Sequence, residues 1–176
     1  MSAQADYIRD PAEIYRRSFA TVEREAALDD LSPAMRAIAI RVVHSCGMVD
    51  IVADLEASAS AAEAGAAALR AGSPVFCDVE MVARGIIESR LPAANAIVCT
   101  LNDEGVEMAA ARDATTRSAA AVDLWSPLDG SVVCIGNAPT ALFRLLERIK
   151  AGEGAPALIV GIPVGFVGAV ESKEAL

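Results

Sequence analysis

Four short runs of apolar, β-prone residues constrain the fold of this chain more than any other feature. They alternate along the sequence with stretches of helical periodicity. A strand that is apolar at every position is buried on both faces, and strands that alternate with helices pair in parallel. The chain is therefore predicted to be an α/β protein, with a three-layer α/β/α arrangement and a mainly parallel central sheet. The four runs are Pro74–Cys77, Ile97–Leu101, Ser131–Ile135 and Leu158–Ile162.

Several of the predicted helices begin and end at recognisable residues. Asp10-Pro11 and Ser32-Pro33 each place a capping side chain before a proline at the first helical position, and Gly47 is a stop signal. Further helices are predicted over residues 60–71, 79–89, 104–112, 116–124 and 138–150. A chain of 176 residues fits one domain, so we expect a single domain over residues 1–176.

Composition excludes several classes of protein. Hydrophobic residues make up 54% of the chain, which excludes a disordered chain. A net charge of −9 leaves no basic face for nucleic acid. The longest uncharged stretch, Gly154–Val170, is short for a membrane span and contains two prolines. The N-terminus lacks the pattern of a secretory signal, so we expect a cytoplasmic protein with no membrane partner.

Metal binding is not expected either. The four cysteines form no CxxC pair and are expected to be free thiols, as in a reducing compartment. The chain has one histidine and no clustered thiols, so a structural zinc site lacks ligands.

The single histidine, His44, is the first candidate for chemistry. On a helical wheel it falls about 180° from the predicted apolar stripe, and Ile40 lies on that reverse side. The stripe runs through Met35, Ile38, Ala39 and Val42. One interpretation is a solvent-facing histidine that interacts with the helix dipole at its C-terminus. The other is a general acid, because the unperturbed pKa of histidine lies nearest neutrality.

The segments that follow the predicted strands are the second candidate. In an open parallel sheet, ligands bind beyond the carboxyl ends of the strands. Gly136–Thr140 leads from a strand into a helix and can offer free backbone N–H groups to an anion, or it can be a plain turn. Another helix start carries two hydroxyls and a guanidinium, from Thr116, Ser118 and Arg117, which could bind a carboxylate. The alternatives are that the threonine only caps the helix and that the arginine is only a surface residue. The apolar loop Pro163–Gly168 fits either a wall of a ligand site or a subunit interface.

Taken together, eight segments resemble the precorrin-8X methylmutase family of cobalamin biosynthesis, also called precorrin isomerases. The resemblance runs from about Asp6 to Leu176, and the Gly-Asn-Ala-Pro-Thr and Pro-Val-Gly-Phe-Val-Gly motifs carry most of its specificity. The segments are Asp6–Asp10, Ile14–Phe19, Val43–Gly47, Cys77–Val82, Thr116–Ala120, Ile135–Phe143, Gly161–Gly168 and Glu171–Lys173.

The resemblance implies an isomerase that moves a methyl group from C11 to C12 of precorrin-8X and gives hydrogenobyrinic acid. It implies that His44 protonates or hydrogen-bonds the ring nitrogen beside the migrating methyl group, that no cofactor is used, and that the chain is a homodimer with its active site near the subunit interface. The substrate is a flat macrocycle ringed by carboxylates, which needs apolar walls and hydrogen-bond donors. The residues expected to bind it are Ser18, Met81, Thr116, Arg117, Ser118, Asn137, Thr140, Phe166 and Lys173.

The sequence departs from the family pattern in two places. Family chains continue past Glu171–Lys173 with a further strand and a glycine-rich segment, whereas this sequence stops at Leu176, so we expect a domain that lacks this C-terminal segment. Relatives that act on the metal-free precorrin often carry a second histidine where this chain has Arg84. Two other functions stay open: a corrinoid-binding or carrier protein without turnover, and a phosphate-binding α/β protein that uses Gly136–Thr140.

Overall fold

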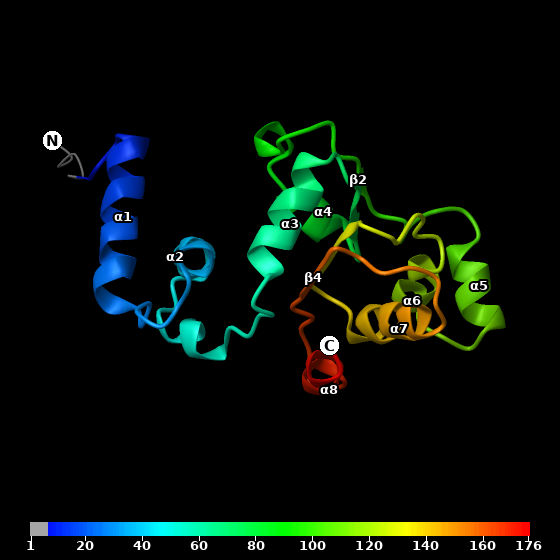
Figure 1. Ribbon diagram of the computed structural model, residues 1–176. Helices are drawn as coiled ribbons and strands as arrows, with labels where there is room; N and C mark the ends of the chain where they lie inside the picture. The colour runs from blue at the N-terminus through cyan, green and yellow to red at the C-terminus, as the bar shows by residue number, and fades with distance from the viewer. Residues whose placement is uncertain (1–6) are drawn as a thin grey trace, which may run out of the picture. The chain divides into compact units, whose positions relative to one another are not determined.

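The structure is a computed structural model that describes residues 7–176 (Figure 1). Residues 1–6 lie outside the described residues. They include Asp6, where the resemblance starts, and most of the N-terminal segment in which no secretory signal was found. Two compact units are present, one ending at Ala62 and the other spanning Glu63–Leu176, and each is described by itself. The single domain over residues 1–176 stays a prediction.

The N-terminal unit contains helices α1 (Pro11–Glu25) and α2 (Pro33–Cys46) and the 3-10 helix η1 (Asp50–Asp54). Both predicted starts are confirmed, because Asp10 accepts a hydrogen bond from the N–H of Ala12 (3.1 Å) and Ser32 from that of Met35 (3.3 Å). Gly47 ends α2 in the left-handed region, at a φ of 73° that favours glycine. A small apolar core holds the unit together, formed by Val22, Leu28, Ala39, Ile40, Val43 and Val52.

The apolar stripe predicted for α2 was partly wrong. Ile38 was placed on the core side but is 41% exposed, whereas Ile40 was placed on the reverse side and is buried. The buried face of α2 therefore runs through Ala39, Ile40 and Val43. Isoleucines occur on both sides of α2, so the sequence pattern fits burial of either face. The packing of α2 against α1 decides which face is buried.

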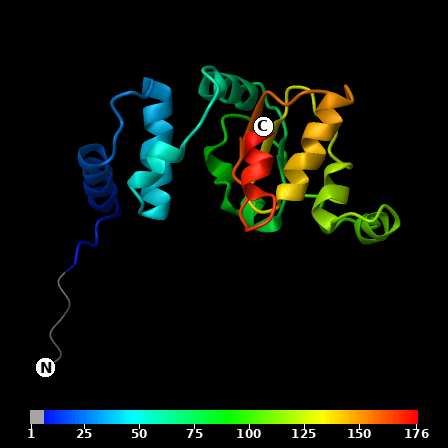
Figure 2. The same cartoon turned by 90° about the horizontal axis from the view of Figure 1, so that it is seen from below.

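The C-terminal unit contains a four-stranded parallel sheet in the order β2-β1-β3-β4. Its strands are β1 (Val75–Cys77), β2 (Ile97–Val98), β3 (Val132–Ile135) and β4 (Leu158–Gly161). Its helices are α3 (Ala61–Arg70, which begins just before the boundary), α4 (Glu80–Gly85), α5 (Val106–Arg112), α6 (Arg117–Val122), α7 (Pro139–Lys150) and α8 (Ala169–Glu174), with a 3-10 turn η2 (Glu88–Arg90). Figure 2 shows the same unit from below, with α7 and α8 side by side.

The two faces of the sheet are covered by different helices, which confirms the three-layer α/β/α prediction. On one face, Phe76 and Val133 pack against Leu142 and Leu145 of α7. On the other, Cys77 and Val132 pack with Ala68 of α3 and with residues of α4. Neighbouring residues of β1 and β3 thus enter opposite cores, as the pleat of a doubly covered strand requires.

Two predicted elements are shortened the most. The strand predicted over 97–101 is only Ile97–Val98, because Thr100 turns into the core: its hydroxyl donates to the carbonyl of Ala121 (2.8 Å) and accepts from the indole N–H of Trp125 (3.1 Å). The helix predicted over 79–89 stops at Gly85. Within the described residues, none of the helices is both long and apolar enough to span a membrane.

Candidate functional site

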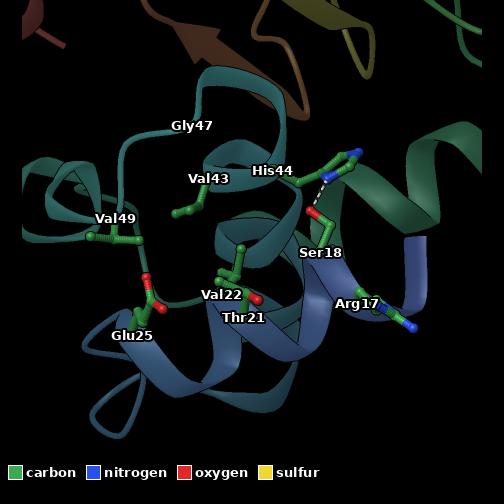
Figure 3. A pocket seen from close by; sticks show the side chains of 9 residues that line it. All are labelled: Arg17, Ser18, Thr21, Val22, Glu25, Val43, His44, Gly47 and Val49. Carbon is green, nitrogen blue, oxygen red and sulfur yellow. Dashed lines mark hydrogen bonds between the residues drawn. The ribbon is translucent and has the colours of Figure 1, made fainter. Parts of the chain in front are cut away.

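His44 is held by a hydrogen bond from the neighbouring helix. Its Nδ1 lies 2.7 Å from the hydroxyl of Ser18, and Figure 3 shows the two side chains pointing toward one another from α2 and α1. When the ring is neutral and Ser18 donates to Nδ1, the ring proton sits on Nε2. The remaining ring nitrogen is then a donor aimed away from Ser18.

Two aromatic rings border the same imidazole. The ring centroids of Tyr15 and Phe19 each lie 5.2 Å from that of His44, the first tilted and the second edge-on. Tyr15, Ser18 and Phe19 lie three and four residues apart, on one face of α1. Sequence reasoning did not connect this face of α1 with His44; the signal was a hydroxyl at the edge of an aromatic i, i+4 pair.

A pocket of 330 Å³ opens beside Ser18 and His44. Its volume lies at the lower end of the range for small-molecule sites, about 300–1,000 Å³, so it suits one edge of a large macrocycle and not the whole of it. Arg17 and Glu25 add one charge of each sign to its lining, and Val22, Val43 and Val49 add apolar wall (Figure 3). The full lining is Arg17, Ser18, Thr21, Val22, Glu25, Val43, His44, Gly47 and Val49.

The turn after β3 has its backbone donors occupied by a side chain of the protein. The carboxylate of Asp78, which follows β1, accepts hydrogen bonds from the N–H groups of Gly136 (3.0 Å), Asn137 (3.0 Å) and Ala138 (2.8 Å). The expectation that these N–H groups are free to bind an anion was therefore wrong, because a buried carboxylate already fills the position of that anion. Asp78 was not among the predicted site residues, although an acidic residue placed directly after a wholly apolar strand was a signal in the sequence.

Two further pairs lie at the starts of neighbouring helices. The hydroxyls of Thr116 and Thr140 are 2.8 Å apart, which links the first turns of α6 and α7. Thr116 also caps α6 by accepting from the N–H of Ala119 (3.1 Å). Arg117 is exposed and donates to Oδ1 of Asn102 (2.9 Å), a partner that orients the guanidinium without neutralising its charge.

The other predicted binding residues of the C-terminal unit lie around the same elements. Ser118 is half-buried on α6, and Asn137 is exposed in the turn. Met81 on α4 is 70% exposed, Phe166 in the loop before α8 is fully exposed, and Lys173 lies exposed on α8. The structure thus joins Ser18 to His44 in the N-terminal unit and Thr116 to Thr140 in the C-terminal unit.

A second hollow, of 300 Å³, is less suited to a polycarboxylate ligand. Its lining includes Asp113, Asp123 and Glu147 and a single cation, Arg144. Arg144 is already engaged by Asp123 (2.6 Å) and Glu147 (3.0 Å), so no net positive charge faces the hollow. A ligand ringed by carboxylates would be repelled there.

The cysteines are all free, and those on the strands are unreactive by environment. Burial raises the pKa of Cys77 to about 12 and that of Cys134 to about 11, and it raises the pKa of Cys99 as well. Cys46 is exposed at the end of α2. Over residues 7–176, no group of three or more His, Cys, Asp or Glu side chains is arranged to hold a metal ion.

These observations define a class: a three-layer α/β protein with a parallel sheet, hydroxyl, amide and cationic side chains at the carboxyl ends of its strands, and a hydrogen-bonded histidine on a helix pair. Residues 13–176 match the Precorrin-8X methylmutase family. A precorrin-8X methylmutase of Pseudomonas aeruginosa is 56% identical over 172 residues, 97% of this chain and 83% of that protein. One from Sinorhizobium is 52% identical over 172 residues, 97% of this chain and 82% of that protein.

A solved structure agrees with the sequence relatives. The precorrin-8X methyl mutase of Thermus thermophilus superposes with a TM-score of 0.83 at 37% identity, and covers 93% of this chain and 80% of its own. The chain belongs to the precorrin-8X methylmutase family and is an isomerase of cobalamin biosynthesis.

Proposed function

We propose that this isomerase moves the methyl group at C11 of precorrin-8X to C12 and releases hydrogenobyrinic acid. The bond from C11 to the methyl carbon breaks, the bond from C12 to that carbon forms, and the ring double bonds shift in compensation. No atom is gained or lost and no electron leaves the substrate, so the reaction needs neither oxidant nor reductant. The protein then has two tasks, to hold the macrocycle and to polarise the ring beside the migrating methyl group.

His44 is proposed as the general acid. The observation that carries this role is the 2.7 Å hydrogen bond between Ser18 and Nδ1, at the mouth of the 330 Å³ pocket. Because the Ser18 hydroxyl is hydrogen-bonded to Nδ1, Nε2 is left to donate a proton or a hydrogen bond to the corrinoid ring nitrogen next to C11. The proton returns to the histidine when the methyl group has moved, so His44 ends each turnover as it began. Positioned proton donors contribute about 10²–10⁴-fold to a rate.

Substrate binding is proposed to use hydrogen-bond donors and apolar walls. Arg117 is a charged donor of the C-terminal unit that is open to a carboxylate, because it is exposed and its partner Asn102 is neutral. The hydroxyls of Thr116 and Thr140 form a second donor pair. Because Asp78 occupies the N–H groups of the turn, carboxylates of the substrate would be bound by side chains and not by that backbone. The full proposed set is Ser18, Met81, Thr116, Arg117, Ser118, Asn137, Thr140, Phe166 and Lys173.

A homodimer in the cytoplasm is proposed as the working form. The apolar loop before α8 supports this, because Val164, Phe166 and Val167 are all exposed. Exposed apolar patches of this kind mark interaction sites more often than free surface.

A single-turnover experiment tests the proposed function. Excess protein is mixed with precorrin-8X, and the absorbance spectrum is followed as the chromophore changes. Conversion to the spectrum of hydrogenobyrinic acid is expected. Binding of precorrin-8X without conversion would instead indicate a carrier, and a protein that bound phosphate or nucleotide but ignored the corrinoid would contradict the proposal altogether.

A further inference from the structure

The buried carboxylate of Asp78 is a feature that the proposed chemistry does not use. Asp78 is only 1% exposed, yet it directly follows β1, at the carboxyl ends of the strands where the proposed binding residues lie. A carboxylate out of water is costly unless its oxygens are paired. Its oxygens accept hydrogen bonds from three consecutive backbone N–H groups, 58 to 60 residues away along the chain.

We propose that Asp78 is a positioning residue for substrate binding: its carboxylate takes the place of an anion in the Gly136–Ala138 turn and so holds Asn137 and Thr140 in the conformation that receives the corrinoid. The inference rests on the proposed function, which assigns Asn137 and Thr140 to the substrate.

The contacts of the turn show how the position of Asp78 reaches those side chains. Oδ1 of Asp78 binds the N–H of Gly136, and Oδ2 binds those of Asn137 and Ala138. Ala138 is the N-cap residue of α7, and Thr140 lies in the first turn of that helix. A negative charge at the N-terminus of a helix of this length is also favoured by the helix dipole.

The same turn is fixed from two other directions. The carbonyl of Asn137 accepts from the N–H of Val164 (3.1 Å), which ties the turn to the loop after β4. An ideal Cβ built on Gly136 would lie 2.8 Å from Cγ2 of Val82, so the turn also packs closely on α4. The segments that follow β1, β3 and β4 therefore meet at this turn, and Asp78 supplies its charged hydrogen bonds.

Removing the carboxylate has a specific consequence. In Asp78→Ala, three N–H groups lose their acceptor and a space the size of a carboxylate is left beside them. The turn then either relaxes, which moves Asn137 and Thr140, or takes up a small carboxylate from solution. Misplacement of binding groups by about 1 Å can cost about 10²-fold in rate.

The experiment compares Asp78→Ala with a matched control, Asn95→Ala. Asn95 is also buried and also makes three hydrogen bonds: it donates to the carbonyls of Leu69 and Ser73 (both 2.9 Å) and accepts from the N–H of Ala93 (3.3 Å). Asn95 and its three partners precede β1 and β2 in the chain, and so lie before the amino ends of these strands and not after their carboxyl ends. Both variants are measured by thermal unfolding, by titration with hydrogenobyrinic acid and by single turnover of precorrin-8X.

Both variants are expected to lose stability, but only Asp78→Ala should bind the corrinoid about 10- to 100-fold more weakly. Added sodium formate should restore part of the binding in Asp78→Ala, because formate fits between the three N–H groups, and should do nothing for Asn95→Ala. A merely structural role would not produce this selective rescue.

A second variant, Asp78→Asn, keeps the shape of the side chain and sets an amide N–H against backbone N–H groups. It should bind the corrinoid more weakly without any response to formate, and it decides the question if Asp78→Ala does not fold. Unchanged corrinoid affinity in either folded variant would overturn the inference, as would failure of both to fold, since Asp78 would then be structural. If the wild-type protein itself neither bound nor converted the corrinoid, the proposed function would fail first.

Discussion

Removing the hydroxyl of Ser18 tests the role of His44 without removing the histidine. Three contacts hold the imidazole: the 2.7 Å hydrogen bond with Ser18 and the rings of Tyr15 and Phe19, each 5.2 Å away between centroids. In Ser18→Ala the two aromatic contacts remain, so the ring stays between α1 and α2. What is lost is the preference for one ring orientation and one tautomer.

The size of the effect follows from that single bond. A hydrogen bond of this kind contributes about 0.5–1.5 kcal/mol net, which corresponds to roughly a 2- to 10-fold change in the population of the productive orientation. Ser18→Ala should therefore slow the methyl shift by roughly 2- to 10-fold. His44→Ala removes the proton donor itself and should slow the shift by about 10²–10⁴-fold. Binding of hydrogenobyrinic acid should change little in His44→Ala, because the proposed carboxylate contacts remain.

The assay is single turnover of precorrin-8X, followed by absorbance. Ser45→Ala is the matched control, because Ser45 neighbours His44 and its hydroxyl donates over the same 2.7 Å, but to the carbonyl of Val42. Turnover by His44→Ala within a few-fold of wild type would refute the general-acid role, and equal losses in Ser18→Ala and His44→Ala would refute the positioning argument.

Three further predictions concern binding, thiol chemistry and assembly. Arg117→Ala should weaken corrinoid binding by roughly 10- to 150-fold, the effect of losing a charged hydrogen bond of about 1.5–3 kcal/mol. Thermal unfolding should stay unchanged because the side chain is exposed. Unchanged affinity in a titration would remove Arg117 from the site. Iodoacetamide at pH 8 should modify Cys46 in the folded protein and leave Cys77 and Cys134 intact, as read by mass spectrometry, because burial keeps those two thiols protonated. Since their pKa values in the folded state are raised, the free energy of unfolding should also fall as the pH rises from about 9 toward about 11–12, and a flat profile there would contradict the assignment. Sedimentation should show a homodimer and Phe166→Asp should weaken it, whereas a monomeric wild-type protein at micromolar concentration would contradict the dimer.

Local features of the sequence were sufficient for much of the fold. The helix starts at Asp10-Pro11 and Ser32-Pro33 and the stop at Gly47 depend on residues within one turn of each other, and the structure has all three. The apolar runs before Asp78 and Gly136 are strands, because apolar residues without alternation suit only a strand covered on both faces.

The arrangement of the site depended on contacts between distant segments. Ser18 and His44 are 26 residues apart, and Asp78 lies about 60 residues from the turn it holds. Periodicity identifies which face of a segment is apolar, but not which side chain of another segment will meet it, as the exposed Ile38 shows. The sequence alone therefore indicated a strand-to-helix turn at Gly136–Thr140. Only the tertiary structure decided that a carboxylate of the same chain occupies its N–H groups, because the packing of β1 beside β3 brings Asp78 to that turn.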